Sequence, residues 1–229
     1  MTTRPVQMIV TILLLIGLVA SPAIASDAEP TTVEDLVVEI EKTYGDVQSL
    51  RADLEQVSRN EAFGEQKTKG KVSLKRPGLM KWDFTEEPGG SLFVTNGKKM
   101  WVYSPTDSRV LVSSDLSQAG GGAPIDLLNS LKNLTEHFDV KLESLEGGKD
   151  SKSTVLVLTP KAEAPFKSVR LVLSKRKYEI ENIAMTDAFG TEVEIIFSRV
   201  QTNSDIPDSE FDFNPPAGVE VIDADSLGL

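Results

Sequence analysis

Residues 71–84, KVSLKRPGLMKWDF, decide the fold class because apolar and polar side chains alternate on both sides of a turn. A period of two residues is typical of a β-strand that buries one of its faces. Pro77-Gly78 interrupts the alternation and is a strong turn signal. The stretch therefore predicts two antiparallel strands whose buried positions are Val72, Leu74, Met80, Trp82 and Phe84.

The same alternation recurs along most of the chain. It begins at Leu50 and returns in residues 91–95, 98–104, 138–142, 154–158, 169–173 and 191–197. Asn96-Gly97 separates two of these stretches and predicts a two-residue hairpin turn. About ten or eleven short strands at this regular spacing predict a mainly β protein, with an antiparallel sheet wrapped into a barrel or half barrel.

An amphipathic helix is expected before the strands. Residues 33–47 carry apolar side chains at three- and four-residue steps, which is the spacing of one helix face. Thr31 and Glu34 have the Thr-x-x-Glu spacing of an N-terminal capping box. We therefore expect a helix of about four turns that ends near Asp46.

A second helical stretch interrupts the strands at residues 124–134. It follows the glycine-rich segment 117–123, and its apolar positions are Ile125, Leu127, Leu128, Leu131 and Leu134. A helix attached to a flexible hinge is a candidate lid. A helix that permanently plugs an open barrel end explains the pattern equally well, so both interpretations stay open.

The first 25 residues have the three parts of a secretory signal peptide. Arg4 supplies a basic end, residues 6–20 an apolar core, and Ala23-Ile24-Ala25 an A-x-A cleavage site. The alternative is an uncleaved anchor helix, but Pro22 interrupts the apolar run where a peptidase needs extended chain. We expect cleavage before Ser26, which leaves residues 26–229 as a single domain in an exported compartment.

The composition excludes several classes of function. The chain has no cysteine, one histidine and a net charge of −11. Without cysteine there is no thiol nucleophile, thiolate zinc site or lipid-anchored N-terminus, and His137 alone cannot form a multi-histidine metal site. The excess of acidic residues opposes binding to nucleic acid. Because the G-x-S-x-G motif is also absent, we expect no enzymatic activity, no metal and no cofactor.

Four stretches resemble the periplasmic lipoprotein carriers of the LolA family. They are KRPGLMKW at residues 75–82, VTNGKKMWVYSP at 94–105, TDAFGT at 186–191 and FDFNPPAGV at 211–219. With the opening helix they cover essentially the whole expected mature chain in the family's order. The resemblance implies an incomplete antiparallel β-barrel, closed by helices that form a lid over an apolar cavity.

The resemblance also implies a function and partners. The cavity would take the acyl chains of lipoproteins that an inner-membrane ABC transporter releases, and the monomeric carrier would pass them to an outer-membrane receptor. A sensing module of the same fold, which binds mislocalised lipoproteins and signals their presence, is the alternative. In the family the arginine of the Arg-Pro element bonds carbonyls of the lid helix, and that role falls on Arg76.

Alternation predicts which side chains would line such a cavity, because each occupies the less polar face of its strand. We expect the cavity to be lined by Leu54, Leu74, Met80, Trp82, Phe84, Met100 and Trp101. The helical stretch beside them would contribute Ile125, Leu127, Leu128 and Leu131. A barrel of this many strands is wide enough to leave an interior that side chains do not fill.

Overall fold

The computed structural model describes residues 32–62, 64–85, 90–114, 127–128, 130–143, 153–162, 164, 166–174, 177–187 and 190–227. The expected signal peptide, its cleavage site and the glycine-rich segment before the second helical stretch lie outside the described residues. Ile125 lies outside them as well.

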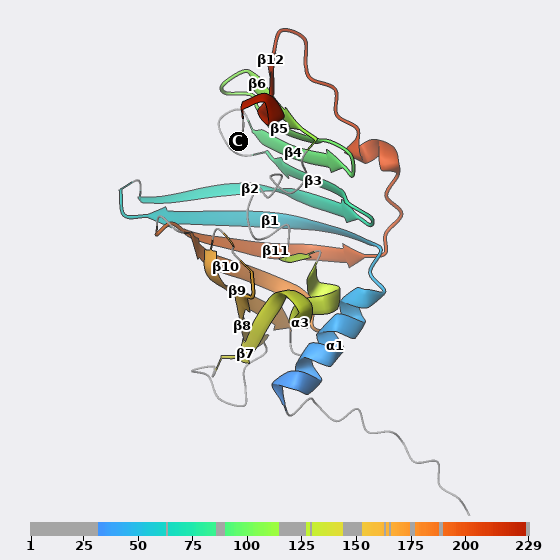
Figure 1. Cartoon of the computed structure of the whole chain (residues 1–229), viewed down its shortest axis with the longest axis vertical. Helices are drawn as coiled ribbons and strands as arrows, with labels where there is room; N and C mark the ends of the chain where they lie inside the picture. Colours follow the sequence, from blue (N-terminus) through green and yellow to red (C-terminus); the bar gives the residue numbers. More distant parts are fainter. Residues whose placement is uncertain are drawn as a thin grey trace, which may run out of the picture.

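One curved sheet holds the twelve strands of the described residues, and the helices lie against one side of it (Figure 1). The strands are β1 (Ser49–Asn60), β2 (Gly64–Lys75), β3 (Leu79–Phe84), β4 (Ser91–Asn96), β5 (Met100–Ser104), β6 (Arg109–Ser113), β7 (Phe138–Leu142), β8 (Ser153–Pro160), β9 (Phe166–Ser174), β10 (Ile180–Asp187), β11 (Glu192–Thr202) and β12 (Glu220–Asp223). The helices are α1 (Val33–Gly45) and α3 (Leu134–His137), and the 3-10 turns are η1 (Leu131–Asn133), η3 (Asp208–Phe211) and η4 (Ala224–Leu227).

The strand order is β12-β6-β5-β4-β3-β2-β1-β11-β10-β9-β8-β7. Strands that follow one another along the chain form antiparallel hairpins within two sets, β1 to β6 and β7 to β11. Antiparallel pairing of β1 with β11 joins the two sets. Because β12 and β7 stand at opposite edges, the sheet does not close on itself, which confirms an incomplete barrel.

The C-terminal edge differs from the all-antiparallel expectation. β12 pairs with β6 in parallel, with Glu220 opposite Arg109 and Asp223 opposite Val112. This short strand adds a twelfth member to the sheet. Asp225 follows it and holds the end of β6, because its carboxylate accepts a hydrogen bond from the Ser114 backbone N–H at 2.9 Å.

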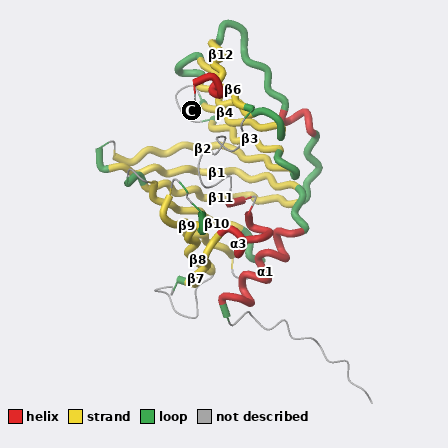
Figure 2. The backbone as a smooth tube through the Cα atoms, in the orientation of Figure 1, coloured by secondary structure: helices red, strands yellow, loops and turns green. Residues whose placement is uncertain are grey.

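The chain between β11 and β12 passes along the outside of the sheet (Figure 2). Glu210 in η3 bonds the Ser73 hydroxyl of β2 at 2.6 Å and forms an ion pair with Arg51 of β1. Lys75 reaches the Ile206 carbonyl at 2.7 Å. Ile206 and Phe211 are buried there with Val94 of β4, so the segment covers a small second apolar cluster.

The β4–β5 hairpin has a longer turn than the sequence predicted. β4 ends at Asn96 and β5 begins at Met100, so residues 97–99 connect the strands. The Asn96 side-chain oxygen accepts hydrogen bonds from the backbone N–H groups of Lys98 and Lys99, at 3.1 and 3.0 Å. Lys98, predicted to begin a strand, is therefore held in the turn by the asparagine side chain.

α1 confirms the predicted opening helix, with its cap one residue later than expected. The Thr32 hydroxyl accepts a hydrogen bond from the Asp35 N–H at 3.1 Å, so Thr32 is the N-cap. Glu34 and Asp35 lie in the first turn, where negative charge favours the helix dipole. The apolar stripe is buried at Leu36, Val37, Ile40 and Tyr44.

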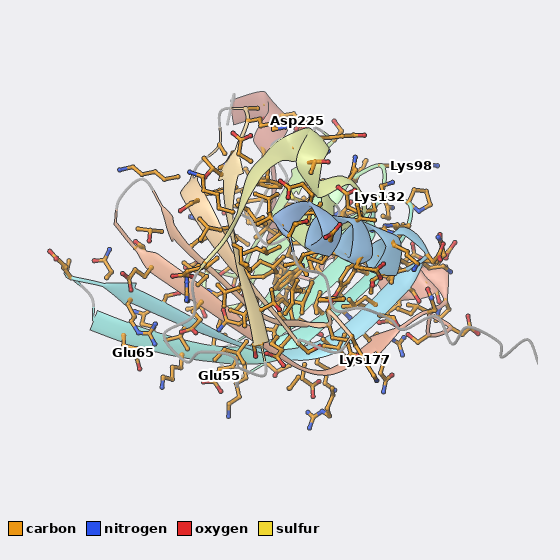
Figure 3. All side chains as sticks on the ribbon, turned by 90° about the horizontal axis from the view of Figure 1, so that it is seen from below. Glu55, Glu65, Lys98, Lys132, Lys177 and Asp225 are labelled. Atoms are coloured by element: carbon orange, nitrogen blue, oxygen red, sulfur yellow. The ribbon has the colours of Figure 1, made fainter. Side chains whose placement is uncertain are left out.

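Figure 3 shows the sheet curving around its helices, with α1 lying across the open side. One large cluster of buried apolar side chains unites α1, the residues before β7, and one face of the sheet from β1 to β5 and from β8 to β11. We call this the inner face. The residues of the candidate site lie on this inner face, in the helices that pack against it or next to them.

Candidate functional site

The inner face brings together six of the seven residues predicted to line a cavity. Leu54, Leu74, Met80, Trp82 and Met100 are buried members of the large cluster, and the half-buried Phe84 packs against it. They come from four different strands. Their shared surface follows from the period of two, since each lies on the same side of its strand as the helices.

Trp101 is the exception among the predicted lining residues. It belongs to the small outer cluster, where its ring lies 6.3 Å from that of Phe213. Met100 beside it faces inward, because adjacent residues of a strand point to opposite faces. The prediction for Trp101 is therefore wrong in its choice of face.

The side chains that cover the inner face come partly from α1. Tyr44 at the C-terminal end of α1 is buried, and its hydroxyl donates to the Tyr178 carbonyl at 3.2 Å. The same oxygen accepts from the Ile180 backbone N–H at 3.0 Å. Burial raises the pKa of the Tyr44 hydroxyl well above its ordinary value, so the group stays neutral. The helix is thereby fastened to the start of β10.

The leucine segment supplies the rest of the cover. We use this name for Leu127, Leu128, Leu131 and Leu134, which are all buried in the large cluster. The Glu41 carboxylate of α1 accepts hydrogen bonds from the Thr135 N–H and hydroxyl at 3.1 and 3.2 Å. The segment thus packs on α1 as well as on the sheet, a placement compatible with either a lid or a plug.

Arg76 lies in the turn between β2 and β3, next to the end of α1. Its Nη1 donates to the Tyr44 carbonyl at 2.8 Å and to the Val47 carbonyl at 2.6 Å. Partial burial lowers the pKa of the guanidinium from its ordinary value, yet arginine remains charged at neutral pH. The hydrogen bonds described for this side chain go to the opening helix, whereas the resemblance implied carbonyls of the lid helix.

The carbonyls that Arg76 binds lie at and just beyond the C-terminal end of α1, since Tyr44 belongs to the last turn and Val47 follows the helix. The last turn has no intrahelical donors for its carbonyl groups, and the helix dipole places partial negative charge there. The Tyr44 carbonyl also accepts a hydrogen bond from the Val47 backbone N–H at 3.3 Å, and the guanidinium, which has several donors, binds this carbonyl and that of Val47 at once. Sequence reasoning found Arg76 through the Arg-Pro motif but had no signal for this choice of helix.

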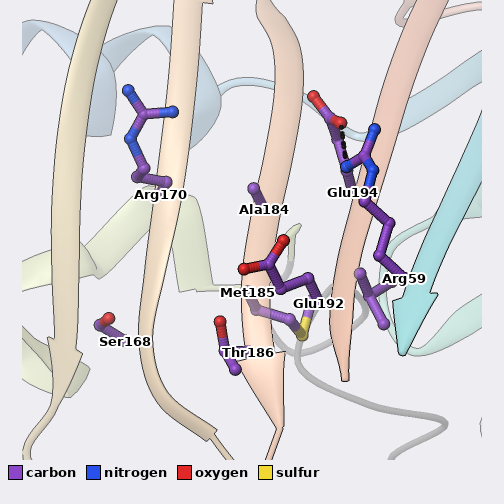
Figure 4. A pocket seen from close by; sticks show the side chains of 9 residues that line it. Arg59, Ser168, Arg170, Ala184, Met185, Thr186, Glu192 and Glu194 are labelled. Carbon is purple, nitrogen blue, oxygen red and sulfur yellow. Dashed lines mark hydrogen bonds and ion pairs between the residues drawn. The ribbon is translucent and has the colours of Figure 1, made fainter. Parts of the chain in front are cut away.

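A pocket of about 390 Å³ lies on β9, β10 and β11 (Figure 4). Three of its charged lining residues form ion pairs, since Arg59 binds Glu194 at 3.1 Å and Arg170 binds Glu143 at 2.5 Å. A second pocket of about 340 Å³ surrounds the ion pair of Asp53 with Arg199. Both pockets have charged linings, which suit an acyl chain poorly, so the inner face remains the candidate site.

The described residues hold no cluster of metal-ligating side chains. No group of three or more histidine, aspartate or glutamate side chains gathers there in a way that could hold a metal ion. His137 ends α3 directly before β7, as the sequence indicated, with Nε2 3.4 Å from the Asn133 amide. Within the part of the chain that the structure describes, no helix has the length and apolar character to cross a membrane.

Comparisons with known proteins agree with the resemblance. Residues 45–214 match the family model of the outer membrane lipoprotein carrier protein LolA. The outer-membrane lipoprotein carrier protein of Azotobacter vinelandii is 31% identical over 212 residues, which cover 91% of this chain and 96% of the relative. That of Dechloromonas aromatica is also 31% identical, over 177 residues that cover 76% of this chain and 81% of the relative.

A solved structure shares the fold at low sequence identity. It is an uncharacterized conserved protein from Thermus thermophilus, which superimposes with a TM-score of 0.52 at 12% identity and covers 83% of this chain and 98% of that one. The family model spans most of the chain, and the Azotobacter vinelandii relative matches this chain nearly end to end. With an incomplete barrel and an apolar inner face under two helical segments, the chain belongs to the LolA family of outer-membrane lipoprotein carrier proteins.

Proposed function

We propose that this protein binds the acyl chains of lipoproteins released from the inner membrane and carries them to the outer membrane. The observation that carries the proposal is the inner face, a continuous apolar surface covered by α1 and the leucine segment. At about 0.8 kcal/mol per methylene, a sixteen-carbon chain costs roughly 12 kcal/mol to leave in water. A carrier must offer such a chain an equivalent apolar surface.

Cargo competes with the protein's own side chains for that surface. In this structure the inner face is covered by residues of α1 and by the leucine segment, both in the same cluster as Met80 and Trp82. An acyl chain can take their place only where a helix moves away from the sheet. The contacts between the helices and the sheet therefore determine the affinity of the protein for its acyl cargo.

Arg76 is the residue we assign to that balance. Its two hydrogen bonds to the end of α1 favour the covered form, and a hydrogen bond to a charged group contributes about 1.5–3 kcal/mol. Because the helices cover the inner face in the empty protein, they compete with the acyl chain, which weakens cargo binding and permits its release. Without these hydrogen bonds the equilibrium shifts from the empty, covered form toward the cargo-loaded form.

The test is Arg76→Leu in a two-stage transfer with labelled lipoprotein. The variant should accept cargo from inner-membrane vesicles yet release roughly tenfold less to outer-membrane acceptors, the change that about 1.4 kcal/mol produces. Arg59→Leu is the matched control, because it removes an exposed guanidinium whose ion pairs are with the side chains of Glu65 and Glu194. Normal release by Arg76→Leu would show that its bonds to α1 do not govern transfer.

A second test addresses the acyl-binding surface. Met80→Glu places a carboxylate on the inner face, where an unpaired charge opposes apolar ligands, and should abolish binding of a long-chain acyl probe. Lys81→Glu puts the same group on the other face of β3 and should bind normally. Phe84→Glu, at a half-buried position, serves if Met80→Glu fails to fold by circular dichroism. Undiminished binding by a folded inner-face variant would exclude this surface.

We infer that the carrier works in the periplasm as a monomer of residues 26–229. An ABC transporter of the inner membrane would supply the cargo, and an outer-membrane receptor would take it. The signal peptide read from residues 1–25 supports export, and family membership supports the route. Intact-mass analysis of the exported protein should give a chain beginning at Ser26. A membrane-bound species that retains residues 1–25 would contradict this location.

A further inference from the structure

Trp82 carries a buried polar group with no partner. Its side chain is 3% exposed, and its indole Nε1 has no hydrogen-bond acceptor. Buried tryptophan N–H groups usually find an acceptor, because an unmade hydrogen bond in an apolar setting costs free energy. The other such atoms among the described residues, on Arg51, Asn182 and Ser204, belong to residues outside the large apolar cluster, and the buried Asp53 oxygen has its ion pair with Arg199.

The ring and cross-strand neighbours of this indole have apolar side chains. The nearest rings are those of Phe84 and Phe197, with centroids 6.3 and 6.4 Å away. The cross-strand partners of Trp82 are Val72 on β2 and Phe93 on β4, both apolar. A hydrogen-bond donor that has no acceptor therefore lies among apolar side chains.

The position along β3 indicates which part of a ligand would meet this donor. Phe84, two residues further on the same face, is half-buried and ends β3, so Trp82 lies near the rim of the inner face. Met80 lies two residues in the other direction and is buried. A chain that enters past Phe84 and runs toward Met80 would bring its first atoms beside the indole.

We propose that the Trp82 indole N–H donates a hydrogen bond to an acyl carbonyl of the cargo. The inference rests on the proposed carrier function and deepens it. Acyl chains on a lipoprotein begin with an ester or amide carbonyl, which is a good acceptor at the head of an otherwise apolar chain. Trp82 is thus a specificity-determining residue that favours acyl chains over alkyl chains of the same length.

The experiment compares synthetic lipopeptides that share one peptide and sixteen-carbon chains. One carries two ester-linked chains, one carries two ether-linked chains, and a third adds an amide-linked chain to the diether. Affinities come from displacement of an anilinonaphthalene sulfonate probe, which has no carbonyl. Wild-type protein should bind the diester about 3- to 10-fold more tightly than the diether, the range that one neutral hydrogen bond supplies.

Trp82→Phe removes the donor and keeps an aromatic ring. It should bring the ester-to-ether ratio to about one, because only the ester loses a bond. Trp101→Phe is the matched control on the outer face and should keep the wild-type ratio. If the amide-bearing lipopeptide depends on Trp82 and the diester does not, the amide carbonyl is the acceptor.

A second measurement does not depend on the folding of Trp82→Phe. In Trp101→Phe the sole tryptophan is Trp82, and its emission should shift further to the red with the diester than with the diether. A ratio near one in the wild type, together with an amide-bearing lipopeptide that binds Trp82→Phe as tightly as it binds the wild type, would overturn the role of Trp82 and leave the carrier function intact. Failure of the wild type to bind either lipopeptide would overturn the carrier function itself.

Discussion

Tyr44 fastens α1 to β10 through one oxygen atom that both donates to Tyr178 and accepts from Ile180. Tyr44→Phe leaves the buried Ile180 N–H unpaired and should lower the free energy of unfolding by about 1–3 kcal/mol. Urea denaturation at pH 7 measures it. Tyr103→Phe, on the half-buried residue that packs on Phe213, is the control and should stay within about 0.5 kcal/mol of wild type. Equal stability of both variants would contradict the role of this hydroxyl.

The same hydroxyl makes stability depend on alkaline pH. Burial raises the pKa of Tyr44 above the unfolded value of 10.0, so the folded state favours the protonated phenol. Its contribution is therefore complete below pH 10 and decreases as the pH rises toward the folded pKa. The stability gap between wild type and Tyr44→Phe should narrow above about pH 10 in parallel urea titrations. A gap that stays constant to about pH 11 would argue against it.

For single residues, the two-residue alternation accounts for most of the correct predictions, because it indicates which face of the sheet each side chain occupies. Alternation places Leu54, Leu74 and four other residues on one surface, and the structure brings all six together. It fails for Trp101 because two neighbouring residues of one strand were both assigned inward. The partners of Tyr44 and Arg76 escape prediction, since a hydrogen bond across the fold leaves no local pattern in the sequence.

Between β2 and β3, Gly70 allows two strands to approach each other. A Cβ atom at this position would lie 2.4 Å from the Asp83 carbonyl oxygen, so any side chain must push the backbones apart. Gly70→Ala should destabilise the protein by about 1–3 kcal/mol. Gly45→Ala, in the last turn of α1 with nothing within 4 Å, should instead stabilise it by about 0.4–1 kcal/mol. Thermal unfolding of the pair distinguishes these signs, and a neutral Gly70→Ala would show that the strands part freely.

A helix or strand can be predicted from the sequence when its apolar residues recur regularly over a long stretch. α1 and the hairpin around Pro77-Gly78 meet that condition and form as expected. The β4–β5 turn does not, because the Asn96 side chain binds two backbone N–H groups and lengthens the loop. β12 escapes prediction since four residues after a proline-rich segment carry too little alternation, and parallel pairing with a distant strand has no local signature.

For the whole molecule, the sequence predicts a curved antiparallel sheet but not where its two sets of strands meet. Hairpins between successive strands follow from short turns, and these account for most of the pairing. The β1–β11 ladder matches Leu54 with Phe197, residues separated by most of the described chain. Which strands pair when they are this far apart in the sequence depends on the shape of the completed inner face. No short stretch of sequence contains that information.

The place of β1 between β2 and β11 also determines an order in time. In a chain that emerges N-terminus first, the β1–β2 hairpin can form at once, while the other edge of β1 waits for residues 192–202. Local pairs form faster than distant ones. In pulsed hydrogen exchange during refolding, amides of β1 that point to β2 should gain protection before alternate amides that point to β11. A single rate for both would contradict this order. Until β11 pairs with β1, the folding chain presents an open strand edge, and during that interval it is most exposed to pairing with other chains.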